Sequence, residues 1–219
     1  MPRGDRNMLA DPSAVTYPRL AFTVDEPLIA RLFLLLQQGV KIRRRVGCSV
    51  DAFLREELGA GPAMSEKIQS IMLDGKPVDD IGAAVVHNGS VLALSAAMPG
   101  LVGATLRRGG AYASFRSALT YHETGKSCAP GGGWVSIKLF NLLMAELGPG
   151  LLRQGVFVKA ADLADFLAEP ERSQEFRQGC SALLDNKAID VKMLEGSIAL
   201  AERDQVLLTV VSARSTPDR

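Results

Sequence analysis

The 219-residue chain has few of the residues from which active sites and disulfide frameworks are built. Its three cysteines, Cys48, Cys128 and Cys180, are too widely spaced for a thiolate metal clip and too few for the disulfide framework of a small secreted domain. Two histidines provide little material for a catalytic triad or a metal site. We therefore expect a cytoplasmic protein with reduced thiols, no metal, no cofactor and no catalytic residue.

An excess of charge of one sign is also missing. The chain has 25 Lys and Arg against 24 Asp and Glu, a net charge of +1, and therefore no global field that would attract nucleic acid or an anionic membrane. Neither partner is expected, and either would need a local patch. The 47% hydrophobic content with 22% charged residues indicates a folded protein.

One segment without Asp, Glu, Lys or Arg, "IGAAVVHNGSVLALSAAMPGLVGATL" (81–106), is long enough to cross a bilayer. Asn88, Gly89 and Pro99 interrupt it, and Asn-Gly is a turn signal. The pattern therefore predicts two buried strands around a turn. Residues 1–18 lack the apolar core of a signal peptide and are predicted to be a polar lead-in.

The stretch "SIMLDGKPVDD" (70–80) returns as "SALLDNKAIDV" (181–191), with identical residues at five positions. Each copy predicts a short strand, a tight turn at Asp-Gly or Asp-Asn where a positive φ is tolerated, and a second strand led by Lys. Downstream, "GSVLALSAAM" (89–98) corresponds to "DQVLLTVVSA" (204–213), a further strand in each copy.

Upstream, each copy has a candidate helix. "SVDAFLREELG" begins at Ser49, a plausible N-cap, and ends at Gly59, whereas "AADLADFLAEP" is stopped by Pro170. Before them, "GVKI" (39–42) parallels "GVFV" (155–158), and "LAFTV" parallels "SIKLF". Residues 25–38 have helical spacing, although a hairpin remains open there, and Gly148-Pro149 predicts only a short helix in "NLLMAELGPG".

These motifs resemble the β-grasp, the ubiquitin-like fold in which a mixed sheet wraps one helix. The resemblance rests on "IMLDGKPVDD" followed by "NGSVLALSA", and on "IKLFNLLMAELGP", which is similar to the opening of the sulfur-carrier proteins of molybdopterin and thiamine synthesis. It implies an α+β fold of two tandem β-grasp-like halves, 19–98 and 134–213. A glycine-rich segment (99–133) joins them, and residues 214–219 form a tail.

In the sulfur-carrier family the reacting group is the carboxylate of a C-terminal Gly-Gly. This chain ends in "SARSTPDR", so the resemblance implies carrier chemistry only at the internal "LRRGG", with Gly109 and Gly110 as the candidate tail after cleavage. A turn between the halves is the simpler interpretation of the two glycines.

Other candidate groupings are weaker. Arg43, Arg44 and Arg45, together with Arg107 and Arg108, form an anion or partner patch if the two runs lie together. "GKS" (125–127) lacks the glycine that a phosphate-binding loop requires. His122, Glu123 and Cys128 are the one grouping with acid–base or thiol potential. Within the connecting segment, "YASFRSALTYHE" alternates like a strand, and Trp134 is expected to bury its ring.

The sequence thus favours a non-catalytic adaptor that binds another protein, since ubiquitin-like modules usually act through their surfaces. Two alternatives stay open. One is a sulfur-carrier-like accessory protein that uses Gly110 after cleavage, and the other is a small-anion-binding module.

Overall fold

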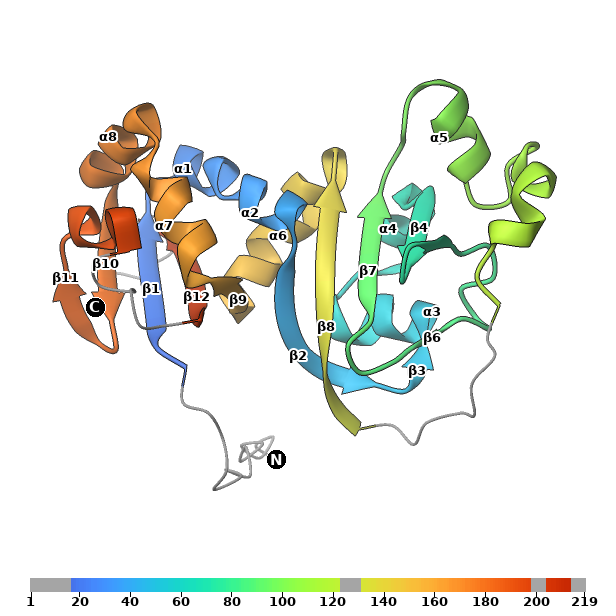
Figure 1. Ribbon diagram of the computed structural model, residues 1–219, viewed down its shortest axis with the longest axis horizontal. Helices are drawn as coiled ribbons and strands as arrows, with labels where there is room; N and C mark the ends of the chain where they lie inside the picture. The colour runs from blue at the N-terminus through green and yellow to red at the C-terminus, as the bar shows by residue number, and fades with distance from the viewer. Residues whose placement is uncertain (1–16, 123–130, 198–203, 214–219) are drawn as a thin grey trace.

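The computed structural model describes residues 17–122, 131–197 and 204–213 (Figure 1). The strands are β1 (Arg19–Val24), β2 (Val40–Val46), β3 (Cys48–Ser49), β4 (Ser70–Leu73), β5 (Lys76–Pro77), β6 (Val85–Val86), β7 (Val91–Ser95), β8 (Gly131–Phe140), β9 (Val156–Lys159), β10 (Cys180–Leu184), β11 (Lys187–Ile189) and β12 (Gln205–Ser212). Ten of them form one mixed sheet in the order β11-β10-β1-β12-β9-β2-β8-β7-β4-β5, while β3 and β6 form a small second sheet. The chain is therefore a mixed α and β protein, consistent with the predicted α+β class.

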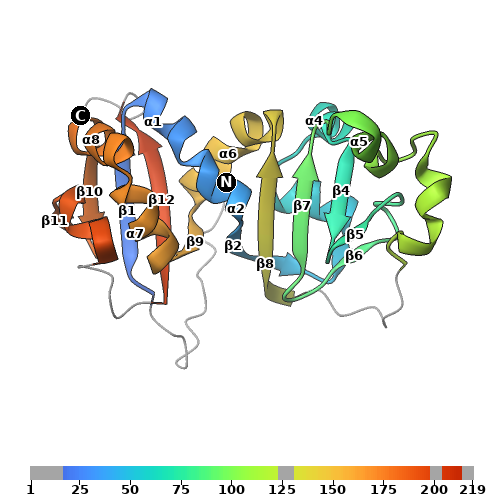
Figure 2. The ribbon, with the colours of Figure 1, turned by 45° about the horizontal axis from the view of Figure 1, so that its top comes forward.

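The helices are short apart from one. They are α1 (Glu26–Arg31), α2 (Phe33–Gln38), α3 (Val50–Ala52), the π-helical turn η1 (Phe53–Glu57), α4 (Pro62–Lys67), α5 (Gly100–Leu106), the 3-10 segment η2 (Ala113–Leu119), α6 (Leu142–Gln154), α7 (Ala160–Ala168), α8 (Pro170–Gly179) and the 3-10 segment η3 (Val191–Ser197). Figure 2 shows α5 and the segment after it at the end of the sheet that carries β4 and β5.

The two expected halves exchange their first strands. β1 lies between β10 and β12, antiparallel to the first and parallel to the second. β8 lies between β2 and β7, antiparallel to the first and parallel to the second. The sheet therefore consists of a β1 group (β11-β10-β1-β12-β9) and a β8 group (β2-β8-β7-β4-β5), and each contains strands from both halves. The groups meet at a single residue pair, Lys41 with Phe157.

The repeated hairpin is confirmed. β4 pairs with β5 and β10 with β11, both antiparallel. The turns carry positive φ at Asp74 (51°) and Gly75 (80°) in the first copy, and at Asp185 (49°) and Asn186 (65°) in the second. Two successive positive φ values fit the right-handed twist of the flanking strands, which explains why Asp, Asn and Gly occupy these positions.

The predicted start of the first repeat's helix is also confirmed, because the Ser49 hydroxyl accepts a hydrogen bond from the Ala52 N–H at 3.2 Å. In the second repeat α7 ends at Ala168, and Pro170 begins α8. Residues 25–38, for which both a helix and a hairpin were open, form the helices α1 and α2.

Two expectations were wrong. The segment after Asn141 is not a short helix, because α6 runs for 13 residues through Pro149. Gly148 removes the side-chain clash that normally breaks a helix before proline, and it packs against Phe33 and Leu36 of α2. Likewise, residues 112–122 form no strand but contain the 3-10 turns of η2, with the buried Arg116 at their centre.

The apolar segment 81–106 contains β6, a turn at Gly89 with φ of 90°, and β7, as predicted, and then the helix α5. Among the described residues no helix has the length and apolar character needed to span a bilayer.

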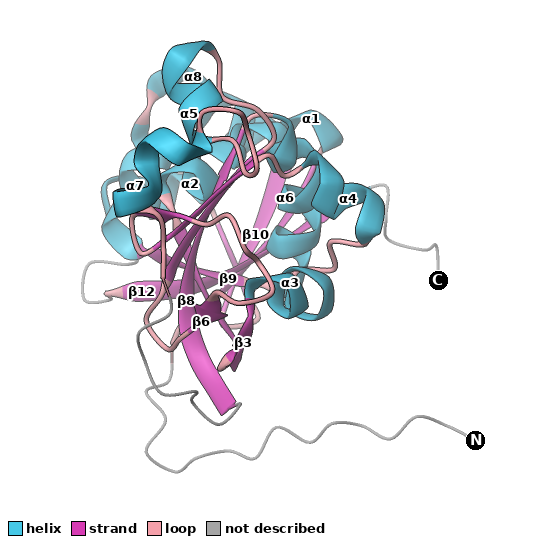
Figure 3. Ribbon diagram, turned by 90° about the vertical axis from the view of Figure 1, so that its right-hand side faces the viewer, coloured by secondary structure: helices cyan, strands magenta, loops and turns pink. Residues whose placement is uncertain are grey.

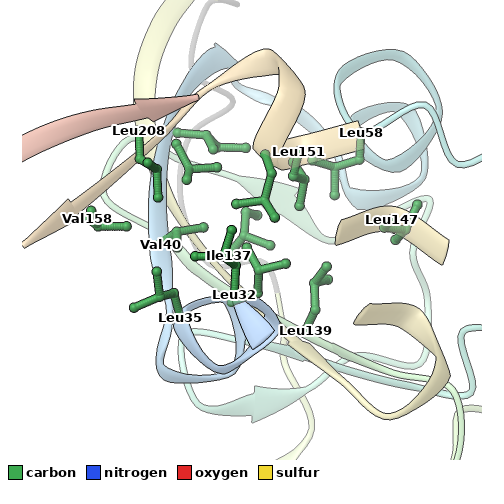
Figure 4. Close-up of a cluster of buried hydrophobic side chains, with 14 of the residues drawn as sticks. Leu32, Leu35, Val40, Leu58, Ile137, Leu139, Leu147, Leu151, Val158 and Leu208 are labelled. Carbon is green, nitrogen blue, oxygen red and sulfur yellow. The ribbon is translucent and has the colours of Figure 1, made fainter. Parts of the chain in front are cut away.

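The core lies between the helices and one face of the sheet. Figure 4 shows Ile137 and Leu139 of β8, Val158 of β9 and Leu208 of β12 converging with Leu147 and Leu151 of α6, so the core is continuous across both strand groups. Figure 3, seen from the end that carries α5, shows how strongly the strands are rotated relative to one another. Alternation along the strands sends the other side chains to the opposite face.

Candidate functional site

The segment from Met98 to His122, here called the arm, stands at the end of the β8 group beyond β4 and β5 (Figure 2). It carries α5 and η2. Three of its large apolar side chains are mostly exposed: Leu101 (73%), Val102 (63%) and Leu119 (68%). Met98 and Tyr112 are also exposed. Such a concentration of apolar side chains in one projecting segment is characteristic of an interaction surface.

A buried ion pair holds the arm to the sheet. The Arg116 guanidinium is 5% exposed and donates to both carboxylate oxygens of Asp79, at 2.7 and 2.9 Å. It also donates to the carbonyl oxygens of Thr105 and Arg107 and to the Thr120 hydroxyl. One side chain from η2 therefore joins the end of α5, the following turn and the residue that ends the first hairpin.

The electrostatics of Asp79 reflect this arrangement. Burial by itself would raise the pKa of the Asp79 carboxyl, but the hydrogen bonds from Arg116, the Gly109 N–H and Thr120, together with the charge of Arg116, more than offset that effect. The pKa of Asp79 is consequently below its ordinary value, and the pair is ionised at neutral pH.

Backbone contacts attach the arm at two further points. The Arg108 N–H donates to the Gln69 carbonyl oxygen, and the Tyr121 N–H donates to the Pro77 carbonyl oxygen, both at 2.8 Å. Within the arm, Gly103 lies so close to the Met98 carbonyl that a Cβ would come within 1.7 Å of its oxygen. The geometry of α5 therefore depends on glycine at this position.

The polar contacts between the arm and the start of β4 are less complete. The buried Oε1 of Gln69, Oγ of Ser70 and Nη1 of Arg108 have no hydrogen-bond partner among the described residues. Unsatisfied buried polar atoms weaken a contact. The Arg116–Asp79 pair is thus the stronger attachment of the arm.

The candidate tail glycines lie in the turn between α5 and η2. Gly109 has a φ of 61°, and its N–H faces Asp79 at 3.4 Å. The Gly110 N–H donates to Arg107 and its carbonyl oxygen accepts from Ala113. The structure therefore places both glycines in a hydrogen-bonded turn inside the arm, and the chain continues from there to β8 in the middle of the sheet.

The structure does not bring the two arginine runs together. Arg43 to Arg45 lie on β2 beside Trp134, Gly133 and Gly132, at the start of β8. The Arg108 N–H donates to the carbonyl oxygen of Gln69, the residue before β4. The next residue, Ser70, pairs with Ser95 of β7, and Ser95 pairs with Phe140, the last residue of β8. The two runs are at opposite ends of the β8 group and form no common patch.

Within the first run the side chains diverge. Arg44 points to the helix side and donates to Gln154 of α6, and burial lowers its pKa despite the charge of Glu57. Arg45 forms ion pairs with Glu56 and Glu57. Arg43 is exposed on the opposite face and forms no ion pair with a described carboxylate.

The structure does not test the grouping of His122, Glu123 and Cys128. His122 is exposed, while Glu123, Cys128 and the "GKS" segment lie outside the described residues. Burial raises the pKa of the Cys180 thiol to about 12 and also raises that of Cys48. Among the described residues no three metal-ligating side chains cluster.

A separate open groove of about 600 Å³ lies between α2 and α7. Its lining residues are Leu34, Gln37, Gln38, Asp162, Asp165, Phe166, Glu169 and Arg172. The Arg172 guanidinium stacks on the Phe166 ring at 4.2 Å and is thereby held in the wall of the groove.

Sequence reasoning did not identify the Arg116–Asp79 pair, although a signal was present. Residues 81–122 contain no Asp or Glu, so a cation in the middle of that segment needs a carboxylate from elsewhere if it is buried.

No protein-family model, no curated protein and no solved structure matches the chain.

Proposed function

We propose that this protein is a non-catalytic adaptor that binds another protein through the arm. The observation that carries the proposal is the exposure of Leu101, Val102 and Leu119 on a single projecting segment. Burying each such side chain in a partner removes apolar surface from water and contributes about 1.5–3 kcal/mol.

The attachment of the arm supports this function. An interface that is ordered before binding loses less conformational entropy when it binds. The bidentate contact between Arg116 and Asp79, with its additional bonds to Thr105 and Arg107, fixes α5 and η2 in advance.

The charges of the arm define the partner's chemistry. Between residues 81 and 122 there is no carboxylate, whereas Arg107 is exposed beside α5. The complementary surface is therefore an apolar protein segment with carboxylates at its rim.

The β-grasp resemblance fits the same proposal. In each strand group five strands include one parallel pair, β1 with β12 or β8 with β7, and pack on helices. This pattern supports two β-grasp-like units with exchanged first strands, and modules of that kind act mainly through their surfaces.

The test combines capture with reconstitution. Proteins retained by the wild-type chain but not by a Leu101→Ser/Leu119→Ser variant are identified and purified, and their affinity is measured by calorimetry. We expect the double variant to bind at least tenfold more weakly. Leu142→Ser, a substitution of a similarly exposed leucine on α6, should leave the affinity unchanged.

Equal binding of both variants by the purified partner would refute the proposal. Arm-dependent binding to anionic vesicles without any protein partner would assign the arm to a membrane surface instead. Arm-dependent self-association in ultracentrifugation would replace the adaptor by a homodimer.

A further inference from the structure

One face of the sheet, here called the open face, lies away from the core and is covered by none of the described helices. Its outward positions follow from strand alternation and register. One row crosses six strands through paired residues Arg19, Leu207, Phe157, Lys41, Ser136 and Val91. At about 4.8 Å per strand, this row is about 24 Å long, which is comparable to several nucleotides of a single strand.

Aromatic rings occupy the centre of this face. Trp134 and Phe157 meet edge to face with ring centroids 4.7 Å apart, and Tyr17 packs on Phe157 at 5.0 Å. All three residues are only half-buried, so each ring keeps surface available to a ligand. Trp134 on β8 and Phe157 on β9 lie on either side of β2, so their rings meet across it. At this point the two strand groups share only one residue pair.

Cations surround the rings. Lys41 and Arg43 project outward from β2, Lys159 from β9, and Arg19 from β1, and all four are exposed. The stem of Lys138 on β8 lies across Gly39, where a Cβ would come within 3.1 Å of it. None of these side chains forms an ion pair with a described carboxylate.

Carboxylates border this surface in the turns at the two ends of the row, where Asp185 Oδ1 accepts from the Arg19 N–H and Asp74 Oδ1 accepts from the Val91 N–H. The ten strands of the large sheet contain no Asp or Glu at any position. Although the net charge of the chain is nearly neutral, the described carboxylates lie outside these ten strands, and the charged side chains on the strands of the open face are all cationic. These cations form the local patch that a chain with almost no net charge needs in order to bind nucleic acid.

We propose that the open face binds single-stranded nucleic acid. Bases stack on Trp134, Phe157 and Tyr17, and the phosphates contact the surrounding Lys41, Arg43, Lys138, Lys159 and Arg19. Aromatic rings within a cationic surface are the combination that recognises unpaired bases, since every base has a π-face and every linkage a negative charge. The stacked bases of a duplex do not offer those faces. The site is independent of the arm.

Trp134 provides a direct readout because it is the single tryptophan of the chain. Titration with dT or rU oligonucleotides of about 12 nucleotides should quench its fluorescence as a base stacks on the indole. Fluorescence anisotropy of the labelled oligonucleotides gives the affinity, and its logarithm should fall with log salt at a slope of about −2 to −3.5. Comparing dT with rU distinguishes a preference for DNA or RNA.

Variants test both parts of the site. Trp134→Leu should weaken binding roughly 5- to 150-fold, with Trp134→Phe restoring most of it. Lys41→Glu/Arg43→Glu should weaken binding more at low salt than at high salt. Arg153→Glu, an exposed change on α6, is the matched control and should bind like wild type. Circular dichroism confirms that each variant is folded.

Three results would overturn the proposal. The first is no binding of either oligonucleotide at low salt. The second is binding that Trp134→Leu leaves unchanged. The third is equal affinity for polyphosphate and for the oligonucleotides, which would show a site for anions in general rather than for bases.

Discussion

Arg116 and Asp79 are 37 residues apart in the chain, yet they form a bidentate ion pair that joins the arm to the end of the first hairpin. The guanidinium is almost wholly enclosed, whereas the carboxylate keeps about a third of its surface (31%). This asymmetry makes the two single substitutions unequal.

Asp79→Ala should destabilise the protein by about 3 kcal/mol, because it leaves the enclosed Arg116 cation without its carboxylate. Arg116→Ala should cost less, about 2 kcal/mol, because water reaches the carboxylate of Asp79. Urea unfolding followed by Trp134 fluorescence gives both values. Arg177→Ala, which removes an exposed pair with Glu195, is the control and should cost under about 1 kcal/mol. Equal losses in all three variants would contradict the prediction.

Attachment of the arm should depend on pH. The pKa of Asp79 is lowered in the folded state, so its contribution to stability is present above the ordinary value of 3.8 and disappears as the pH falls toward the lower folded value. Hydrogen exchange at the Arg108 and Tyr121 amides should therefore accelerate below about pH 4, beyond the intrinsic change. Asp79→Asn, which does not titrate, should lose this response, and an identical response in both proteins would refute it.

Gly103→Ala should disrupt α5, because the new Cβ would overlap the Met98 carbonyl oxygen at 1.7 Å. We expect a loss of at least about 2 kcal/mol or an arm that opens locally, seen as rapid proteolysis within 98–122. Gly150→Ala is the matched helical control. Nothing lies within 4 Å of its Cβ, so this change should stabilise α6 by about 0.5–1 kcal/mol.

The Cys180 thiol should be almost inert in the folded protein. With its pKa raised to about 12 by burial, about one thiol in ten thousand is ionised at pH 8. Iodoacetamide labelling read by mass spectrometry should modify Cys180 slowly in buffer and rapidly in urea. The same rate in both conditions would show that the thiol is not buried in solution.

Local features of the fold were predictable from the sequence. The Asp-Gly and Asp-Asn turns need positive φ at both central residues, and Ser49 needs only its own next three residues to act as an N-cap. Such features depend on neighbours in the chain, which the sequence displays directly.

Long-range choices were not predictable. β1 and β8 are similar apolar strands in a repeated unit, so pattern alone does not say which copy each one joins. The alternating pattern of its segment did not indicate that Arg116 is buried, because its partner Asp79 lies outside that segment. Trp134 was expected to bury its ring but lies half-buried against Phe157. The reason is that the sequence alone does not say which face of the sheet the helices cover.

The exchange of first strands also constrains how the chain folds as it leaves the ribosome. β1 is synthesised early, but both of its partners, β10 and β12, belong to the last part of the chain. The apolar face of β1 (Leu20, Phe22 and Val24) and both of its hydrogen-bonding edges must therefore wait, unpaired, through most of translation. The β8 group meanwhile lacks the strand between β2 and β7 until residue 140 has emerged. Sheet formation is consequently a late and strongly non-local event, which predicts slow folding and dependence on factors that shield β1 in nascent chains.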